Sequence, residues 1–216
     1  MAEDKRTLLL QSTVRAVAKC GMKDVSTRSI SGDAGINDAY IYRYFRDKED
    51  MLMQAYFLEN ERFMRCVGKQ IDAIREERER FTLEERCHLG FRCAWRYLID
   101  NPDVCRFFVY YYHSPNFQKY AFEEHRKQVD YLAEKILHLF ERLPDAEDCL
   151  YALFTLLHSF ALRVLNGELP DDAETEERVF KMVFTTILTQ MKATETPEDS
   201  ENDQKGNGAP VPGSEN

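Results

Sequence analysis

Apolar residues recur at intervals of three and four along almost all of residues 1–192, which is the spacing of one face of an α-helix. Alternation of apolar and polar residues with period two, typical of a β-strand, is absent from the sequence. Capping residues, glycines and prolines divide the apolar pattern into segments. The pattern therefore predicts an all-α protein of about nine helices, the longer ones near 5–20, 48–74, 83–98, 117–142, 145–166 and 174–192.

Two short helices with a tight turn between them are predicted for residues 26–45. Ser26 has the residue type of an N-cap, and Gly35 follows the last apolar position of the first helix, where a left-handed residue commonly ends a helix. Asn37 would cap the second helix, in which Ile41 and Phe45, four residues apart, face inward. This is the layout of a helix-turn-helix, whose second helix lies in the major groove of DNA.

A longer set of residues makes this pattern more specific. It runs from Ser26 and Ile30 through Ala34-Gly35-Ile36-Asn37 to Ile41-Tyr42, Tyr44-Phe45, Lys48-Glu49 and Leu52. With these residues, the segment of about 8–52 resembles the TetR/AcrR family of bacterial transcription regulators. The resemblance implies a three-helix DNA-binding domain at 1–50 and a helical ligand-binding and dimerisation domain at 51–192. Three residues depart from the pattern or weaken it: Ser31, where the family usually has Ala, Gly32 inside a helix, and the acidic Asp38.

The second short helix supplies the residues expected to read DNA. Since Ile41 and Phe45 face inward, the residues around them face outward, at the N-terminal turns from which a recognition helix contacts bases. By resemblance, Tyr42, Tyr44 and Lys48 bind phosphates. The alternative is that the tyrosines only stack on one another. The expected DNA-contacting residues are Thr27, Arg28, Asn37, Asp38, Ala39, Tyr40, Tyr42, Arg43, Tyr44 and Lys48.

The net charge of −9 argues against indiscriminate binding of nucleic acid. The acidity lies outside the DNA-reading segment, because residues 1–50 contain nine Lys and Arg against eight Asp and Glu. Residues 193–216 contain one Lys, six Asp and Glu, and no aromatic residue. We therefore expect them to form a disordered acidic tail. Specific DNA binding should then depend on a few well-placed contacts and on a dimer.

Two C-terminal segments are apolar on more than one face. In 145–166 an apolar stripe is widened by Tyr151, His158 and Leu162, and 174–192 is similarly broad. A helix that is apolar nearly all round is buried on both sides, so we expect these helices from two subunits to form a four-helix bundle. The resemblance implies dimerisation at the same place. The expected interface residues are Leu150, Leu153, Phe154, Leu157, Ala161, Val179, Val183 and Ile187.

Aromatic residues are dense between positions 95 and 117. At least half of them should be core, but buried tyrosines need hydrogen-bond partners, and a mostly apolar ligand cavity supplies such partners. The resemblance implies an inducer pocket between the equivalent helices. The expected lining residues are Trp95, Phe108, Tyr111 and His158, and no residue pattern identifies the ligand.

Other classes of function find little support. The sequence has no Gly-rich phosphate loop, no H-E-x-x-H and no G-x-S-x-G, so we expect neither an enzyme nor a cofactor. The six cysteines form no C-x-x-C pair and lie at no metal-ligand spacing with the five histidines, so we expect no metal site. Reduced thiols in helix cores are expected, with redox sensing by a cysteine as the alternative.

No apolar run approaches bilayer-spanning length and no signal peptide opens the chain, so we expect a cytoplasmic protein with no membrane partner.

These features predict a ligand-responsive transcriptional repressor that binds a pseudo-palindromic DNA operator as a homodimer and is released by a small-molecule inducer. Two alternatives stay open. One is a helical regulator that acts through protein partners with weakened specific DNA binding, suggested by Gly32, Asp38 and the nearly neutral N-terminal domain. The other is a small-molecule-binding protein or enzyme with a vestigial helix-turn-helix.

Overall fold

The structure is a computed structural model that describes residues 2–137 and 146–193, and these residues form helices and no strands. The all-α prediction is therefore confirmed. The α-helices are α1 (Ala2–Asp24), α2 (Thr27–Ala34), α3 (Ile41–Tyr44), α4 (Lys48–Glu76), α5 (Leu83–Asp100), α6 (Pro102–Tyr112), α7 (Pro115–Tyr120), α8 (Phe122–Leu137), α9 (Ala146–Leu165) and α10 (Ala173–Ala193). Single turns of 3-10 helix lie at Asp38–Tyr40 and Arg78–Arg80.

The described residues contain ten α-helices rather than about nine, because the helix predicted for 117–142 is two helices. The Ser114 side chain caps α7 by accepting from the backbone N–H of Phe117, and Ala121, at φ −121°, leaves the helical conformation before α8 begins. The end of that predicted helix, at 138–142, and the predicted acidic tail from 194 onward lie outside the described residues.

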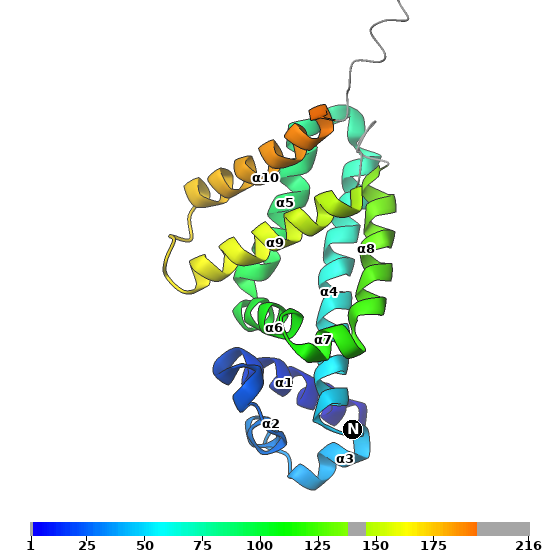
Figure 1. The fold of residues 1–216 in the computed structure, drawn as a ribbon, viewed down its shortest axis with the longest axis vertical. Coiled ribbons are helices and arrows are strands. Elements are labelled where there is room, and N and C mark those ends of the chain that lie inside the picture. Colours follow the sequence, from blue (N-terminus) through cyan, green and yellow to red (C-terminus); the bar gives the residue numbers. More distant parts are fainter. Residues whose placement is uncertain (1, 138–145, 194–216) are drawn as a thin grey trace, which may run out of the picture.

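Figure 1 shows a small unit of α1, α2 and α3 at one end of the molecule and a larger helical unit at the other. The small unit has its own core, in which Val17, Ile30 and Ile41 are fully buried. The domain boundary expected at residue 50 falls inside α4, which begins at Lys48 and continues into the larger unit. The two units are therefore joined by a shared helix, and α6 also packs against α1.

Local capping explains where most helices begin and end. Ser26 and Ser29 form a reciprocal capping box at α2, and Gly35 ends that helix at φ 63°, as predicted. Thr82 and Glu85 form a capping box at the start of α5. Asn101 precedes α6 but does not cap it, because its Nδ2 donates instead to the carbonyl oxygen of Tyr97 at 2.8 Å.

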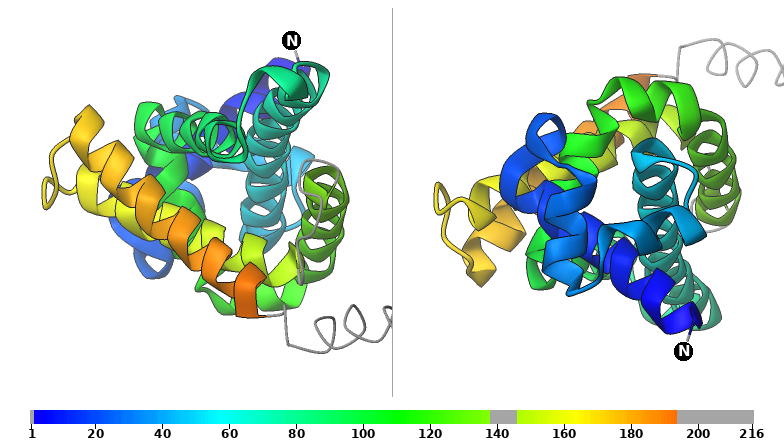
Figure 2. Two further views of the ribbon diagram at one scale, coloured as in Figure 1. Left: turned by 90° about the horizontal axis from the view of Figure 1, so that it is seen from above. Right: turned by 90° about the horizontal axis from the view of Figure 1, so that it is seen from below.

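In the larger unit, α9 and α10 run side by side across the molecule, and α8 lies beside α4 (Figure 2). Within the described residues, the segment Glu147–Leu165 of α9 is long and apolar enough to cross a membrane by length and composition alone, contrary to the expectation from the sequence. A core helix of a soluble protein passes the same test, and α9 packs against α5, α6, α8 and α10. Its apolar character is therefore accounted for by helix packing.

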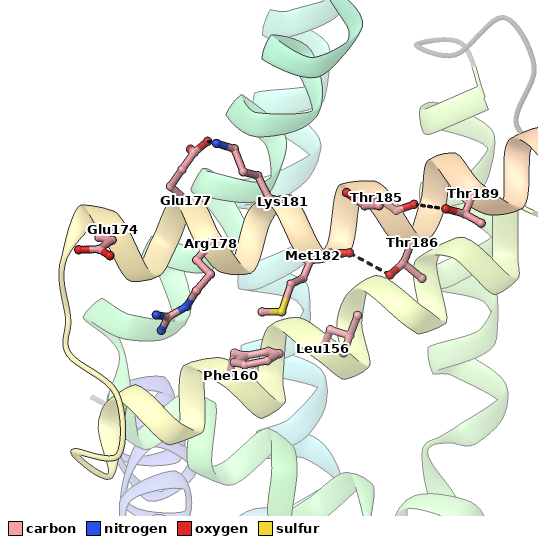
Figure 3. A pocket seen from close by; sticks show the side chains of 10 residues that line it. All are labelled: Leu156, Phe160, Glu174, Glu177, Arg178, Lys181, Met182, Thr185, Thr186 and Thr189. Atoms are coloured by element: carbon pink, nitrogen blue, oxygen red, sulfur yellow. Dashed lines mark hydrogen bonds and ion pairs between the residues drawn. The ribbon is translucent and has the colours of Figure 1, made fainter.

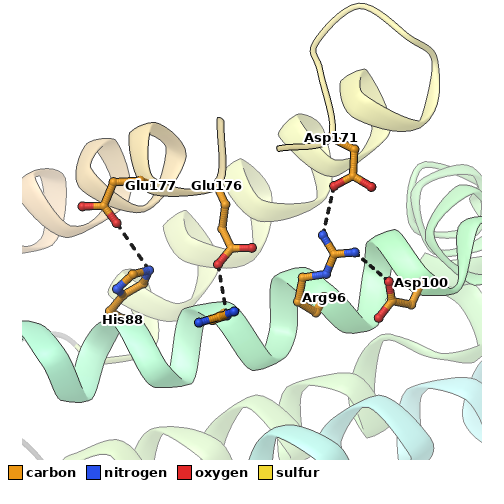
Figure 4. A network of polar contacts seen from close by, with 7 residues as sticks. His88, Arg96, Asp100, Asp171, Glu176 and Glu177 are labelled. Atoms are coloured by element: carbon orange, nitrogen blue, oxygen red, sulfur yellow. Dashed lines mark hydrogen bonds and ion pairs between the residues drawn. The ribbon is translucent and has the colours of Figure 1, made fainter. Parts of the chain in front are cut away.

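A ladder of ion pairs fixes α10 and the segment before it against α5 (Figure 4). Arg96 contacts Asp171 at 2.9 Å and Asp100 at 2.8 Å, and Arg92 pairs with Glu176 at 3.4 Å. One turn further along, the His88 ring stacks on Phe180 with its centroid 4.4 Å away. Exposed pairs of this kind each contribute little free energy, so their main effect is to orient α10.

The turn between α2 and the 3-10 helix yields a matched pair of predictions. Gly35→Ala forces a side chain into a left-handed backbone and should lower the free energy of unfolding by about 1 kcal/mol. Gly32→Ala should instead raise it by up to about 1 kcal/mol, because a Cβ there meets nothing within 4 Å and Ala favours the helix. Urea denaturation measures both values, and equal changes in the two variants would contradict the assignment of the turn.

Candidate functional site

The residues expected to read DNA form a largely exposed surface on the small unit. Asp38, Ala39 and Arg43 are exposed, and the Tyr42 side chain is 63 % exposed with no ring contact among the described residues. Tyr40 is half-buried between two cations, with Lys5 Nζ at 4.8 Å and the Arg43 guanidinium carbon at 4.5 Å from its ring centroid. The tyrosines therefore do not stack on one another. The Tyr40 ring instead makes cation–π contacts with Lys5 and Arg43 at the surface.

The recognition segment begins as a 3-10 turn and continues as α3. The Asn37 side chain caps the turn by accepting from the backbone N–H of Ala39 at 2.9 Å. The buried Ser31 hydroxyl donates to the Asp38 carboxylate, and so ties α2 to this turn. Two of the three residues that depart from the family pattern or weaken it are thus partners, and one oxygen of the Asp38 carboxylate accepts a hydrogen bond within the chain.

The start of α4 brings further polar groups to the same surface. Lys48 is half-buried, and its Nζ donates to the carbonyl oxygen of Val25 at 3.3 Å, next to the N-terminus of α2. Thr27 and Tyr44 are half-buried, whereas Arg28 is exposed. Arg46 was not among the expected contacts, although its side chain is 78 % exposed on this surface. Its position directly after the buried Phe45 is the sequence signal that would have identified it.

Most of the residues expected at the dimer interface are buried within a single chain. Leu150, Leu157, Ala161, Val179 and Val183 are buried within one chain, so no partner can reach them. The reason is that α9 and α10 cover the chain's own α5 and α8 with this stripe. Leu153, Phe154 and Ile187 are half-buried and line internal cavities.

The open face of the same two helices forms an outer groove (Figure 3). Leu156 and Phe160 of α9 face Met182 of α10 across it, and Met182 is 40 % exposed. The groove is lined by Leu156, Phe160, Glu174, Glu177, Arg178, Lys181, Met182, Thr185, Thr186 and Thr189. It combines an apolar strip with charged residues of both signs.

A second site, the inner cavity, lies among α4, α6, α8 and α9 and has a volume of about 300 Å³. It is lined by Tyr56, Asn60, Phe63, Met64, Phe108, Val109, Tyr112, His113, His125, Tyr151, Phe154, Thr155, His158, Ser159 and Leu162. Two of the expected pocket residues, Phe108 and His158, are among them. This volume and this mixture of aromatic and polar side chains are typical of a small-molecule site.

The other two expected pocket residues belong to the core. Trp95 is 1 % exposed and stacks on Phe91, with the ring centroids 5.8 Å apart. Tyr111 is fully buried between Tyr56 and Phe107, with centroids at 5.0 and 5.6 Å. Its hydroxyl has no hydrogen-bond partner within the described residues. The expectation for Trp95 and Tyr111 is therefore wrong, because both rings point into aromatic packing and not into the cavity.

Hydrogen bonds define the polar groups of the inner cavity. The Tyr56 hydroxyl lies 2.8 Å from His125 Nδ1, and Asn60 Nδ2 donates to Gln128 Oε1. His158 Nδ1 lies 2.8 Å from the carbonyl oxygen of Phe154. Because a carbonyl only accepts, Nδ1 carries the hydrogen, and Nε2 of the neutral ring is left as an acceptor.

Two of the three histidines that line the inner cavity, His125 and His158, are held neutral. Burial lowers the pKa of His125 to about 4, and the nearby His158 adds to this effect. Burial also lowers the pKa of His158, although the hydrogen bond to Phe154 opposes the shift. His125 and His158 therefore offer uncharged hydrogen-bonding groups near neutral pH.

Residues of α4 are the main cavity residues missed from the sequence. Tyr56 and Phe63 lie on the apolar face of the helix predicted for 48–74, and Asn60 lies on that face between them. A buried amide on an apolar face is unfavourable without partners, and this was the available signal. The contribution of α8 through His125 required knowledge of the packing.

None of the six cysteines forms a disulfide within the described residues. The sulfurs of Cys66 and Cys93 lie 3.5 Å apart between α4 and α5. Burial raises the pKa of Cys93 to about 12, and the same holds for Cys87 and Cys105. Protonated thiols react slowly with oxidants, so this environment favours packing over redox sensing.

Comparisons with known proteins agree with this architecture. Residues 9–55 match the family model described as bacterial regulatory proteins of the tetR family. The chain is also similar to the crystal structure of a TetR family transcription regulator from Marinobacter aquaeolei VT8, with TM-score 0.68 and 20 % identity over 86 % of this chain and 96 % of that one. A TetR-like transcriptional regulator from Rhodococcus sp. RHA1 gives TM-score 0.65 and 19 % identity over 85 % and 96 %. No curated protein sequence matches the chain.

The neutral state of His125 predicts a pH dependence of stability. Its folded-state pKa lies below the value of 6.5 that it has when unfolded, so the unfolded chain binds more protons between pH 6.5 and 4. The free energy of unfolding should fall as the pH is lowered through this window, by at most about 3 kcal/mol from this residue. In His125→Gln, which can still hydrogen-bond Tyr56, the fall measured by urea denaturation should be smaller. Identical pH profiles of the two proteins would show that His125 does not stay neutral.

Proposed function

Given that this chain is a DNA-binding transcriptional regulator of the TetR family, we propose that it acts as a homodimeric repressor that leaves its operator when a small molecule fills the inner cavity. The observation that carries the proposal is the path of α4. This helix begins at the DNA-reading surface with Lys48 and lines the inner cavity further along with Tyr56, Asn60 and Phe63.

The exposed face of the small unit supports specific DNA binding. Tyr42, Arg43 and Arg28 lie on one accessible surface, with the positive charge of Lys5 and Arg43 gathered on Tyr40. Phosphate contacts position such a surface, and the exposed residues of the 3-10 turn and α3 contact base edges. The hydrogen bond from Ser31 leaves Asp38 a weaker acceptor for a cytosine amino group, so base reading rests mainly on Ala39, Tyr40 and Arg43.

The outer groove supports the homodimer in place of the stripe expected from the sequence. Leu156 and Phe160 are only half-buried within one chain and Met182 is 40 % exposed, so this apolar strip is accessible to a partner. In a two-fold dimer the same face meets itself, and Glu177 with Arg178 provides both signs of charge for complementary contacts. Two recognition helices about one DNA turn apart then match a pseudo-palindromic operator.

The position of α4 supports release by a ligand. A ligand that requires more space at Tyr56 and Phe63 favours a displaced α4, and with it another spacing of the two DNA-binding units. The ligand shifts this equilibrium only through its different affinity for the two states.

The alternative that the chain acts through protein partners predicts no sequence-specific complex with DNA. Selection of DNA from a random pool by the purified protein, followed by mobility shift, separates the two. Enrichment of a palindromic sequence supports the repressor. A pool that stays random after repeated selection rejects it.

Lys48→Ala should weaken binding to the selected operator by removing a phosphate contact. The slope of log K against log salt concentration should decrease by about 0.9 per subunit, and the loss should be similar for all operator variants. Lys127→Ala, which removes the same charge from an exposed site on α8, is the matched control and should leave the slope unchanged. If the slopes of wild type and Lys48→Ala agree, Lys48 does not contact phosphate.

Phe160→Glu should break the dimer, because it places an unpaired charge in the apolar strip of the outer groove. The expected cost of roughly 3 kcal/mol or more corresponds to at least about a hundredfold rise in the dimer dissociation constant. Sedimentation should detect folded monomer. Tyr131→Glu introduces the same charge at a side chain of α8 that is 60 % exposed, and should remain dimeric. A Phe160→Glu dimer of undiminished stability would place the interface elsewhere.

A further inference from the structure

The inner cavity has an apolar neighbour. This second space, the apolar cavity, lies among α4, α5, α8, α9 and α10 and has a volume of about 100 Å³. Its walls include Val67, Ile71, Phe91, Leu132, Leu153 and Phe180. Phe154 lines both cavities, so one half-buried aromatic side chain separates them.

The two cavities follow one another along α4. Tyr56 lines the inner cavity and Ile74 lines the apolar cavity, and the rise of an α-helix places them roughly 27 Å apart along the axis. A change of rotamer at Phe154 would join the two spaces into one elongated site. The shape therefore fits a long, narrow ligand better than a compact one.

Apart from Arg86, the strongly polar groups of this site lie in the inner cavity. His158 presents Nε2 as an acceptor with no partner among the described residues, and Asn60 uses its Nδ2 for Gln128, which leaves Oδ1 as a further acceptor. No Asp, Glu, Lys or Arg is among the described residues that line the inner cavity. An ionised ligand group would be buried there without a counter-charge, at a high desolvation cost.

We propose that the ligand is an uncharged amphiphile, whose head donates an O–H or N–H group to His158 in the inner cavity and whose apolar tail passes Phe154 into the apolar cavity. This inference rests on the proposed function, because it names the class of molecule that would act as inducer. Long-chain alcohols and amides have this chemistry.

One residue favours the opposite orientation of the ligand, with its polar head in the apolar cavity. Arg86 lines the far end of the apolar cavity, and its Nε is buried without a hydrogen-bond partner within the described residues. A carboxylate on a long chain could pair with it. Yet Arg86 as a whole is only half-buried, and a long Arg side chain commonly covers apolar surface with its stem while its charged end stays in water. The comparison of an alcohol with a carboxylate of equal length decides between the two.

The experiment titrates the full-length protein with straight-chain primary alcohols of increasing length, and with 1-dodecanol against dodecanoate at pH 8. Trp95 is the only tryptophan and stacks on Phe91, a wall of the apolar cavity, so its fluorescence reports filling of that space. Affinity should rise with chain length up to a limit, and dodecanol should bind about tenfold or more tightly than dodecanoate. Tighter binding of dodecanoate, or no binding of any alcohol, would overturn the proposal.

Two variants test the two ends of the site. Gly90 lines the apolar cavity, and a Cβ there meets nothing within 4 Å, so Gly90→Leu should fill the space and shorten the longest alcohol that binds, whereas Gly90→Ala should change the limit little. His158→Phe should weaken alcohol binding about tenfold through the lost hydrogen bond. His88→Phe, outside both cavities, should not. If Gly90→Leu leaves the length limit unchanged, the tail does not lie in the apolar cavity.

Operator release is measured separately by mobility shift with the same alcohols. Alcohols that bind and release the operator support both proposals. Alcohols that bind in the predicted order without releasing the operator leave the ligand class standing and reject its role as inducer. Specific operator binding without any alcohol binding rejects the ligand class and leaves the DNA-binding function intact.

Discussion

The unbroken backbone hydrogen-bond ladder of α4 is the constraint on which the rest of this structure depends. The helix runs for 29 residues, roughly 43 Å at 1.5 Å per residue. Asp47 caps its first turn, and its buried residues continue from Met51 to Ile74. A helix cannot absorb a displacement in its middle without losing hydrogen bonds. The surface that carries the predicted DNA contacts at one end and the two cavities further along are therefore connected by one rigid helix.

The aromatic interior explains why a cavity exists beside such a well-packed core. Tyr56 contacts Phe108, Tyr111 and Phe117 by stacked and edge-to-face geometry, and these rings fill the base of the larger unit. Above them, Asn60, His125 and His158 introduce polar atoms that must find partners. Their hydrogen bonds leave acceptors without protein donors, and such groups keep a space open to water or to a ligand.

In the small unit, two residues that are unfavourable when considered separately form a hydrogen bond with each other. Asp38 considered alone repels phosphate, and Ser31 considered alone is a buried hydroxyl within a helix. Together they satisfy each other and connect α2 to the recognition turn. The cation pair around Tyr40 then restores positive potential at the surface. The weak net charge of this unit is compatible with DNA binding, because the placement of charge matters more than its sum.

Secondary structure and the identity of the DNA-binding unit followed from local chemistry. The caps at Ser26, Thr82 and Asp47, the left-handed turn at Gly35 and the spacing of Ile41 and Phe45 each involve residues close in sequence, so the chain itself carries the information. Phe108 and His158, expected to line a ligand pocket, do line the inner cavity, and their binding of a ligand stays a prediction. The DNA contacts, the dimer and the ligand stay predictions.

Only the tertiary structure decided which apolar face of α9 and α10 packs into the chain's own core and which faces the outer groove. Periodicity showed that α9 and α10 are apolar on more than one side, but it could not assign Leu157 to the chain's own core and Phe160 to an open groove, because both choices satisfy the same pattern. For the same reason Trp95 and Tyr111 were placed in the pocket, while Tyr56 and His125 were missed. Whether an aromatic side chain meets a void or another ring depends on residues distant in sequence, and their packing cannot be derived from spacing along one helix.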